Sequence, residues 1–199
     1  MRNPATDKVR LTADQRGASV PEFALILIPL CLVLFGGLEI GFQIYVRAVT
    51  LGALERATRL TTLQTVDSNA AEAEIEDQIK RLIPSARVET TKGSFYQYSN
   101  INAMERLTRD ANNNGTLDSG DCWEDVDDNG ARNIVTTGRA DSIGGADDIV
   151  RYNTVVTYNR ILPLYRFIGI GNTASVTATT MVRRQPYEVQ STPTVRCKA

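Results

Sequence analysis

The amino-terminal part of the chain contains one long run of apolar residues, and this run constrains the fold more than any other feature. Residues 23–38, FALILIPLCLVLFGGL, carry no charge, and the run continues to Val46 with one interruption, Glu39. A helix over residues 23–46 would span roughly 36 Å, more than the ~30 Å hydrocarbon core of a bilayer. The run therefore predicts a transmembrane helix rather than the core helix of a soluble domain.

Basic residues precede the apolar run, and they set the expected orientation. Because positive flanks stay on the cytoplasmic side, we expect a cytoplasmic leader and an exported remainder in a single-pass membrane protein. A cleaved secretory signal is the alternative, but the run is long for such a signal and no A-x-A site follows it. Within residues 1–16 the charged side chains are Arg2, Lys8, Arg10 and Arg16 against Asp7 and Asp14.

Two glutamates lie at the ends of the apolar run. Glu22 precedes it directly, and Glu39 lies near its far end. An unpaired carboxylate within a bilayer costs a few kcal/mol, so each glutamate needs a partner or a route to water. We expect the Glu39 side chain to reach the outer interface, whereas Glu22 needs a cation.

The overall composition excludes several classes of function. The 199 residues carry a net charge of −1 and contain no histidine. The near-neutral charge gives no reason to expect a nucleic-acid partner. Without histidine there is no Ser-His or Cys-His nucleophile pair and no imidazole-based zinc site. We therefore expect no catalytic residues and no enzymatic activity.

The charges are nevertheless segregated along the chain. Residues 110–148 hold ten acidic residues and two arginines, a net charge of −8, while residues 150–199 hold seven basic residues and one glutamate, a net charge of +6. These segments either attract each other in the fold or face separate partners, and composition does not choose between the two.

The residues around the start of the apolar run, RGASVPEF at 16–23, resemble the processing site of type IV pilin-like precursors. The resemblance implies cleavage by a prepilin peptidase between Gly17 and Ala18, with Glu22 as the fifth residue of the mature chain and Phe23 directly after it. In a filament of packed helices, the new terminal ammonium of one subunit would neutralise the glutamate of its neighbour. Because burying either charge alone is prohibitive, this pairing would set the subunit register.

A longer segment, RGASVPEFALILIPLCLVLFGGLEIG at 16–41, is similar to the amino-terminal helix of the TadE-like proteins of tight-adherence (Flp) pilus assembly. Segments 122–130, 144–158 and 183–188 resemble the exported part of that family more loosely. The resemblance implies a minor pseudopilin that assists pilus assembly, with the membrane, the prepilin peptidase and other pilin or pseudopilin subunits as partners. The alternative is a single-pass, unprocessed periplasmic protein that binds calcium or another ligand.

The expected fold class is α+β. We divide the chain into a cytoplasmic leader (1–17), a transmembrane and extended helix (18–63), and a periplasmic domain (64–199) with an acidic loop at 110–130. Ser68 is a candidate N-cap for a second helix that ends before Pro84. Residues rich in Val, Thr and Tyr then predict a small antiparallel sheet, with strands at 86–92, 94–99, 133–138, 148–161 and 173–185. The helix should continue beyond the membrane to about Leu63, because Ile44, Leu51, Leu54 and Thr58 recur at helical spacing.

The segment DANNNGTLDSGD at 110–121 has the spacing of an EF-hand-type calcium loop, with glycine at position 6. We expect a structural calcium ion there; the alternative is an Asn/Asp/Gly loop whose side chains satisfy only their own turns. A poorer candidate, Asp125, Asp127 and Asn129 before Gly130, lacks a carboxylate at position 12. The predicted ligands of the first loop are Asp110, Asn112, Asn114, Thr116 through its carbonyl, Asp118 and Asp121.

The chain has three cysteines. Cys31 lies within the apolar run and is most simply a small apolar residue. Cys122 and Cys197 fall in the part expected to be exported, and in an oxidising periplasm we expect them to form a disulfide.

Overall fold

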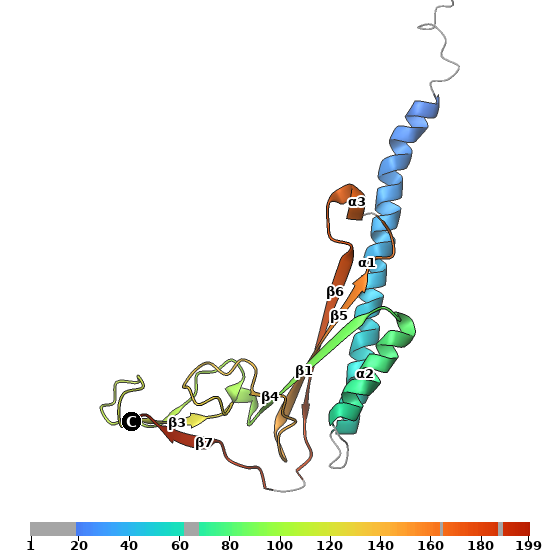
Figure 1. The fold of residues 1–199 in the computed structure, drawn as a ribbon. Coiled ribbons are helices and arrows are strands. Elements are labelled where there is room, and N and C mark those ends of the chain that lie inside the picture. The colour runs from blue at the N-terminus through green and yellow to red at the C-terminus, as the bar shows by residue number, and fades with distance from the viewer. Residues whose placement is uncertain (1–18, 62–67, 164, 187–188) are drawn as a thin grey trace, which may run out of the picture.

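The computed structural model describes residues 19–61, 68–163, 165–186 and 189–199 (Figure 1). The expected α+β class is confirmed: a long amino-terminal helix is followed by a second helix and antiparallel sheets. The predicted leader, residues 1–17, lies outside the described residues. The elements in chain order are α1 (Ser19–Thr61), α2 (Ser68–Leu82), β1 (Arg87–Phe95), the 3-10 turn η1 (Tyr98–Asn100), β2 (Leu107–Arg109), β3 (Cys122–Asp125), β4 (Arg139–Ala140), β5 (Ile149–Asn159), α3 (Tyr165–Ile168), β6 (Thr173–Arg183) and β7 (Thr194–Cys197).

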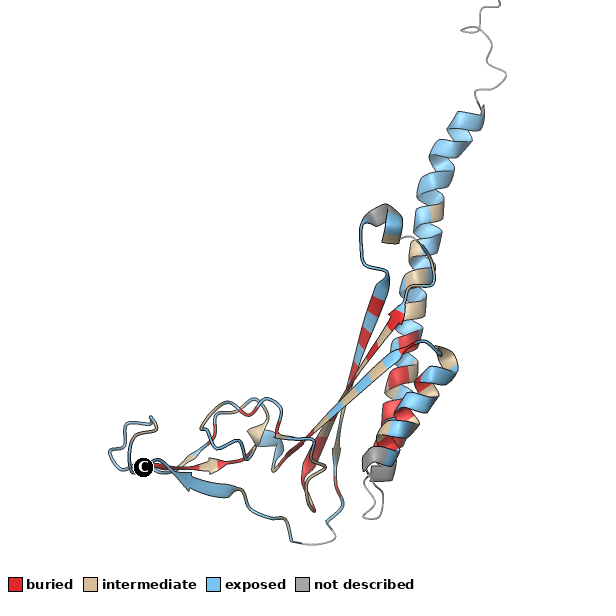
Figure 2. Ribbon diagram, viewed as in Figure 1, coloured by how far each residue is buried: buried red, intermediate tan, exposed pale blue. Residues whose placement is uncertain are grey.

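The helix α1 has an uncovered amino-terminal half and a packed carboxy-terminal half (Figure 2). Large apolar side chains from Val20 to Phe35 are exposed. Of the described helices, α1 is the one long and apolar enough to cross a membrane, with a mean hydropathy of 2.5 over its most apolar window and none of that window buried. The predicted apolar helix is therefore present as a candidate membrane anchor.

The packed half of α1 buries a narrow stripe of small and apolar residues: Val46, Thr50, Ala53, Leu54, Ala57 and Thr58. These positions recur at the three- and four-residue spacing of one helix face. Of the residues whose spacing predicted that the helix continues beyond the membrane, Leu54 and Thr58 are buried, Leu51 is half-buried and Ile44 is exposed. Ile44 lies half a turn away from Val46.

The helix α2 packs against α1 through Ala71, Ile75 and Ile79, which are buried at helical spacing. It begins at the predicted Ser68 and ends before Pro84, which cannot continue a helix. Its outer face carries an i,i+4 ion pair from Arg81 to Asp77.

The main sheet is antiparallel with strand order β4-β1-β5-β6. Alternate side chains of β5 and β6 are buried, so one face of the sheet forms a shared core with α1 and α2. Tyr152 and Val156 lie at the centre of this core, and Tyr158 packs edge-on against Phe42 of α1 with ring centroids 5.6 Å apart.

The sequence predicted one sheet, but the structure has two. A second, three-stranded sheet with order β2-β3-β7 lies at the end of the molecule far from the uncovered half of α1 (Figure 1). The strands predicted at 86–92 and 94–99 are replaced by one strand, β1, which ends at Phe95, and residues 98–99 of the second prediction lie in η1. The predicted strand 133–138 is irregular and contributes only an isolated bridge between Ile134 and Met104.

Candidate functional site

The predicted processing site lies at the amino-terminal end of α1. Gly17 and Ala18 lie outside the described residues. Glu22 and Phe23 are exposed, and Glu22 occupies the first turn of the helix, where a negative charge is favoured by the helix dipole. No cation among the described residues forms an ion pair with Glu22, so its partner would have to come from elsewhere.

Glu39 forms an ion pair inside the molecule instead of reaching only toward the outer interface. Its Oε1 lies 3.3 Å from Nη1 of Arg160, which follows β5. The two side chains are 12% and 20% exposed. The pair therefore joins the sheet to α1 just beyond the uncovered apolar half.

In the first acidic loop, hydrogen bonds join four of the predicted calcium ligands, Asn112, Asn114, Thr116 and Asp118. Asp118 Oδ2 accepts hydrogen bonds from Asn112 Nδ2 (3.0 Å), Asn114 Nδ2 (2.6 Å) and Thr116 Oγ1 (3.4 Å). The two amide hydrogen bonds lower the pKa of Asp118 below its usual value. Asp110, at position 1 of the loop, accepts hydrogen bonds from the backbone N–H groups at positions 5 (3.2 Å) and 6 (2.8 Å).

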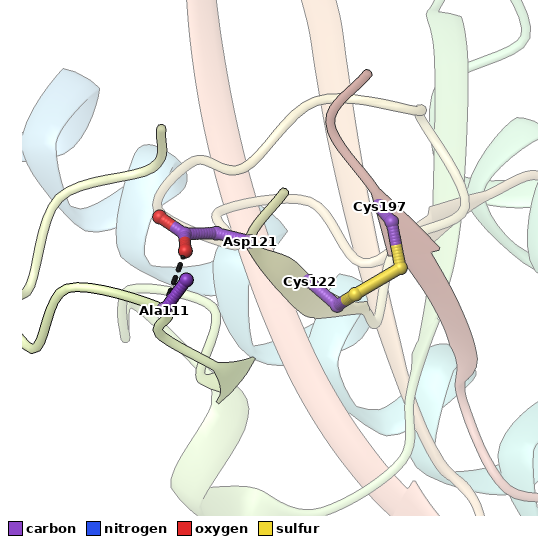
Figure 3. The surroundings of a disulfide bond; sticks show 4 residues. All are labelled: Ala111, Asp121, Cys122 and Cys197. Atoms are coloured by element: carbon purple, nitrogen blue, oxygen red, sulfur yellow. Dashed lines mark hydrogen bonds between the residues drawn. A yellow bond between two sulfur atoms is a disulfide. The ribbon is translucent and has the colours of Figure 1, made fainter. Parts of the chain in front are cut away.

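Asp121, at position 12, closes the first loop. Its carboxylate is fully buried and accepts hydrogen bonds from the backbone N–H of Ala111, at position 2 (2.7 Å), and of Asp118, at position 9 (2.8 Å). Figure 3 shows this carboxylate directed at Ala111, next to the disulfide between Cys122 and Cys197. The disulfide of the adjacent Cys122 thus restrains the backbone at Asp121.

The disulfide predicted between Cys122 and Cys197 is confirmed. The two cysteines are directly paired across β3 and β7. Lys198 continues this pairing, because its backbone N–H donates to the Asp121 carbonyl at 2.9 Å. Cys31 is a free cysteine on α1.

The second acidic loop repeats the hydrogen bonds of the first. Asp125, at position 1, accepts hydrogen bonds from the backbone N–H of Asn129, at position 5 (3.1 Å), and of Gly130, at position 6 (2.9 Å). Asp110 accepts from the same two positions of the first loop. The two loops therefore share one backbone conformation over their first half, although their sequences match only in part.

Glu105 takes the place of the missing carboxylate at position 12 of the second loop. Its Oε1 accepts from the backbone N–H of Val126, at position 2 (2.7 Å), and its Oε2 from that of Asn133, at position 9 (3.3 Å). Asp121 accepts from the same two positions in the first loop. Glu105 precedes the loop in the sequence, so a motif read along the chain cannot find it. The expectation that this loop lacks a closing carboxylate is correct for its sequence and wrong for its three-dimensional structure.

The second loop concentrates negative charge. One carboxylate oxygen from each of Glu105, Asp125 and Asp127 lies within 4.8 Å of the others, and Glu105 and Asp125 are 2% and 1% exposed. Burial raises the pKa of the Glu105 carboxyl, and the negative charges of Asp127 and Asp125 add to the rise against two opposing backbone hydrogen bonds. Burial raises the pKa of Asp127 as well. Ionised carboxylates at this spacing repel one another unless a cation lies among them.

Arginines of the basic carboxy-terminal segment offset part of the negative charge of the acidic segment. Arg196 of β7 forms ion pairs with Asp125 and Asp128, and Arg183 pairs with Asp147 at 3.2 Å. The oppositely charged segments seen in the sequence therefore attract each other within the fold, which answers the question that composition left open.

Comparison with known protein families gives a match to the amino-terminal part of the chain. Residues 17–59 match the family model described as TadE-like protein. No curated protein and no solved structure matches the chain. The matched residues contain Glu22, the apolar run and most of α1, which are the features that carried the resemblance. The amino-terminal helix is therefore similar to the TadE-like protein family, as its sequence indicated.

Proposed function

We propose that this protein is a minor pseudopilin-like component of tight-adherence pilus biogenesis. In this proposal a prepilin-type peptidase cuts between Gly17 and Ala18, and the mature protein assists pilus assembly from the inner membrane. It acts as a binding and assembly component rather than as an enzyme. Its partners are the peptidase, the membrane and the helices of other pilin or pseudopilin subunits.

The division of α1 into two halves is the observation that carries this proposal. The uncovered half begins with Glu22 and is apolar up to Leu38, whereas the second half is covered by α2 and the main sheet. Because its second half is held by α2 and the main sheet, α1 exposes an apolar helical segment, with Glu22 at its amino-terminal end, to a bilayer or to neighbouring helices. Residues 19–38 would span about 30 Å, the thickness of the hydrocarbon core.

Glu22 gives a physical reason for cleavage of the leader. Glu22 has no ion-pair partner among the described residues, and a lone carboxylate among packed apolar helices is unfavourable. Cleavage before Ala18 would create an ammonium group close to the membrane boundary. This group on one subunit would neutralise Glu22 of the next, so the pairing would select one register between subunits.

The basic leader and the disulfide support a periplasmic location for the region after α1. Basic flanks favour a cytoplasmic amino terminus. The disulfide between Cys122 and Cys197 fits an oxidising compartment.

The two acidic loops support a structural calcium ion in each loop as part of the same proposal. Both loops use one carboxylate at position 1 and a second carboxylate bound to the N–H groups of positions 2 and 9. Calcium prefers oxygen ligands, and its charge would offset the repulsion within each cluster. The ions would stiffen the region around β3 and would take no part in chemistry.

The second candidate function is an unprocessed membrane-anchored protein that binds calcium or another ligand through these loops. The paired loop geometry favours it as well, because that geometry does not depend on cleavage. The two functions differ in the mature amino terminus, which begins at Ala18 in the first and at Met1 in the second.

Substitution of Glu22 tests the proposed role in assembly. In cells lacking the native copy, Glu22→Ala should reduce the number of pili, while the Cys122–Cys197 disulfide still forms. Glu55→Ala is the matched control, since Glu55 is an exposed acid on the same helix outside the apolar run. Equal piliation by the two variants would contradict the proposal.

A further inference from the structure

The connection between β5 and β6 lies next to the predicted membrane boundary. Its described residues are 160–163 and 165–172, which we call the membrane-proximal loop. Figure 1 shows that α3, within this loop, extends past the ends of β5 and β6 toward the amino-terminal end of α1. The loop therefore extends from the sheet in the direction of the bilayer.

Contacts with α1 fix the position of this loop along the helix, at the end of the uncharged run. Arg160 pairs with Glu39, the first charged residue after the uncharged run that ends at Leu38. Beside this pair, Leu38, Glu39 and Phe42 of α1 line a groove of about 270 Å³ together with Ile161 and Leu162. If residues 19–38 cross the hydrocarbon core, the loop lies where the core meets the headgroups.

The side chains of the loop are unusual for a connection facing water. Ile161 and Ile170 are 58% and 43% exposed. Tyr165 is half-buried, and the guanidinium of the exposed Arg166 lies 5.8 Å from the centroid of its ring. Exposed isoleucine and arginine beside a half-buried tyrosine on one short segment are typical of a surface that lies in the headgroup layer, where the apolar groups enter the acyl boundary and the cation meets lipid phosphate.

We infer that the membrane-proximal loop is a second membrane contact, which inserts Ile161 and Ile170 into the outer boundary of the same bilayer that α1 crosses. The apolar surface of the loop continues the apolar surface of α1, so we infer that the same lipid bilayer contacts both. The exposed apolar surface runs from Leu38 of α1 across the groove to Ile161 of the loop. A second contact beside the helix would hold the sheet at a fixed tilt and would place the acidic loops at the far end of the molecule, away from the membrane.

Tryptophan quenching by brominated lipid tests this inference on the full chain. The native protein has one tryptophan, Trp123, which is buried in β3 and serves as an internal reference. In vesicles of phosphatidylcholine and phosphatidylglycerol with dibrominated acyl chains, the tryptophan added by Ile170→Trp should lose most of its fluorescence. That added by Val195→Trp, at an exposed position of β7, should lose none.

Leu30→Trp verifies that α1 has inserted, because this position lies within the apolar run and should also be quenched. Quenching at Leu30→Trp, with no more quenching at Ile170→Trp than at Val195→Trp, would overturn the inference and leave α1 as a membrane helix. Replacing Arg166 with glutamine in the Ile170→Trp protein should weaken quenching in anionic vesicles more than in vesicles of phosphatidylcholine alone. The inference depends on α1 crossing the bilayer and is independent of cleavage before Ala18, so its failure would leave the proposed function standing.

Discussion

Arg160 and Glu39 are 121 residues apart in the sequence, yet Nη1 of the arginine lies 3.3 Å from Oε1 of the glutamate. The pair joins the end of β5 to α1 at the point where the uncovered apolar half of the helix ends. An acid that the sequence placed in the apolar run without a partner is thereby neutralised within the same molecule.

Removal of Arg160 should destabilise the contact between the sheet and α1. Arg160→Met leaves the Glu39 carboxylate largely buried without a cation, and we expect a loss of about 1.5–3 kcal/mol in the free energy of unfolding in detergent micelles. The double variant Glu39→Gln/Arg160→Met should recover part of that loss, because no charge then stays unpaired. Equal stability of Arg160→Met and the native protein would show that the pair contributes nothing.

Calcium should stabilise the full-length protein against thermal unfolding. At a free calcium concentration 100 times Kd, a single site contributes about 2.7 kcal/mol, so Tm measured in calcium should exceed Tm measured in EDTA. Asp110→Ala should reduce this difference in Tm by weakening the site in the first loop. Glu105→Gln should reduce it by weakening the site in the second loop.

Asp141→Asn is the control for these variants, since Asp141 lies outside both loops and has a φ of 52°, which asparagine also adopts readily. A Tm that is the same in calcium and in EDTA would reject the calcium sites. If Glu105→Gln responded to calcium like the native protein, Glu105 would not complete the second site.

Loss of the disulfide should affect both stability and the first loop. The link between Cys122 and Cys197 closes a chain separation of 75 residues, and the chain-entropy model gives about 4 kcal/mol for a loop of this length. The double variant Cys122→Ser/Cys197→Ser should unfold at lower denaturant concentration and bind calcium more weakly, because Asp121 loses its fixed neighbour. Cys31→Ser should behave like the native protein; the account would be wrong if it lost as much stability as the double variant.

The glycines of β1 and α1 should respond oppositely to alanine. A Cβ atom at Gly93 would lie 1.9 Å from the Thr137 carbonyl oxygen, so Gly93→Ala should force the backbones apart and cost about 1–3 kcal/mol. At Gly52, on the exposed side of α1, a Cβ atom meets nothing within 4 Å, and Gly52→Ala should add about 0.5–1 kcal/mol of helix stability. Chemical denaturation of both variants measures the difference, and similar shifts in the same direction would contradict it.

Local sequence patterns predicted the elements that depend on local physics. The apolar run predicted α1, Ser68 and Pro84 predicted the bounds of α2, and alternation of Val, Thr and Tyr predicted β5 and β6. The second sheet escaped prediction because β2, β3 and β7 are short and are defined by pairing between distant segments.

The same distinction applies to the candidate site. The first acidic loop is contiguous, so its six candidate ligands could be proposed from spacing alone. Glu105 was missed because only the folded chain brings it to the second loop, against the N–H groups of Val126 and Asn133. Arg160 was missed as the partner of Glu39 for the same reason.

The mature amino terminus tests the central claim most directly. Intact-mass and amino-terminal peptide mass spectrometry should be applied to the protein extracted from native membranes, with a peptidase-deficient strain as the control. The account predicts a chain that begins at Ala18 in the first strain and at the original amino terminus in the second. A chain that keeps Met1 in membranes with active peptidase would contradict it.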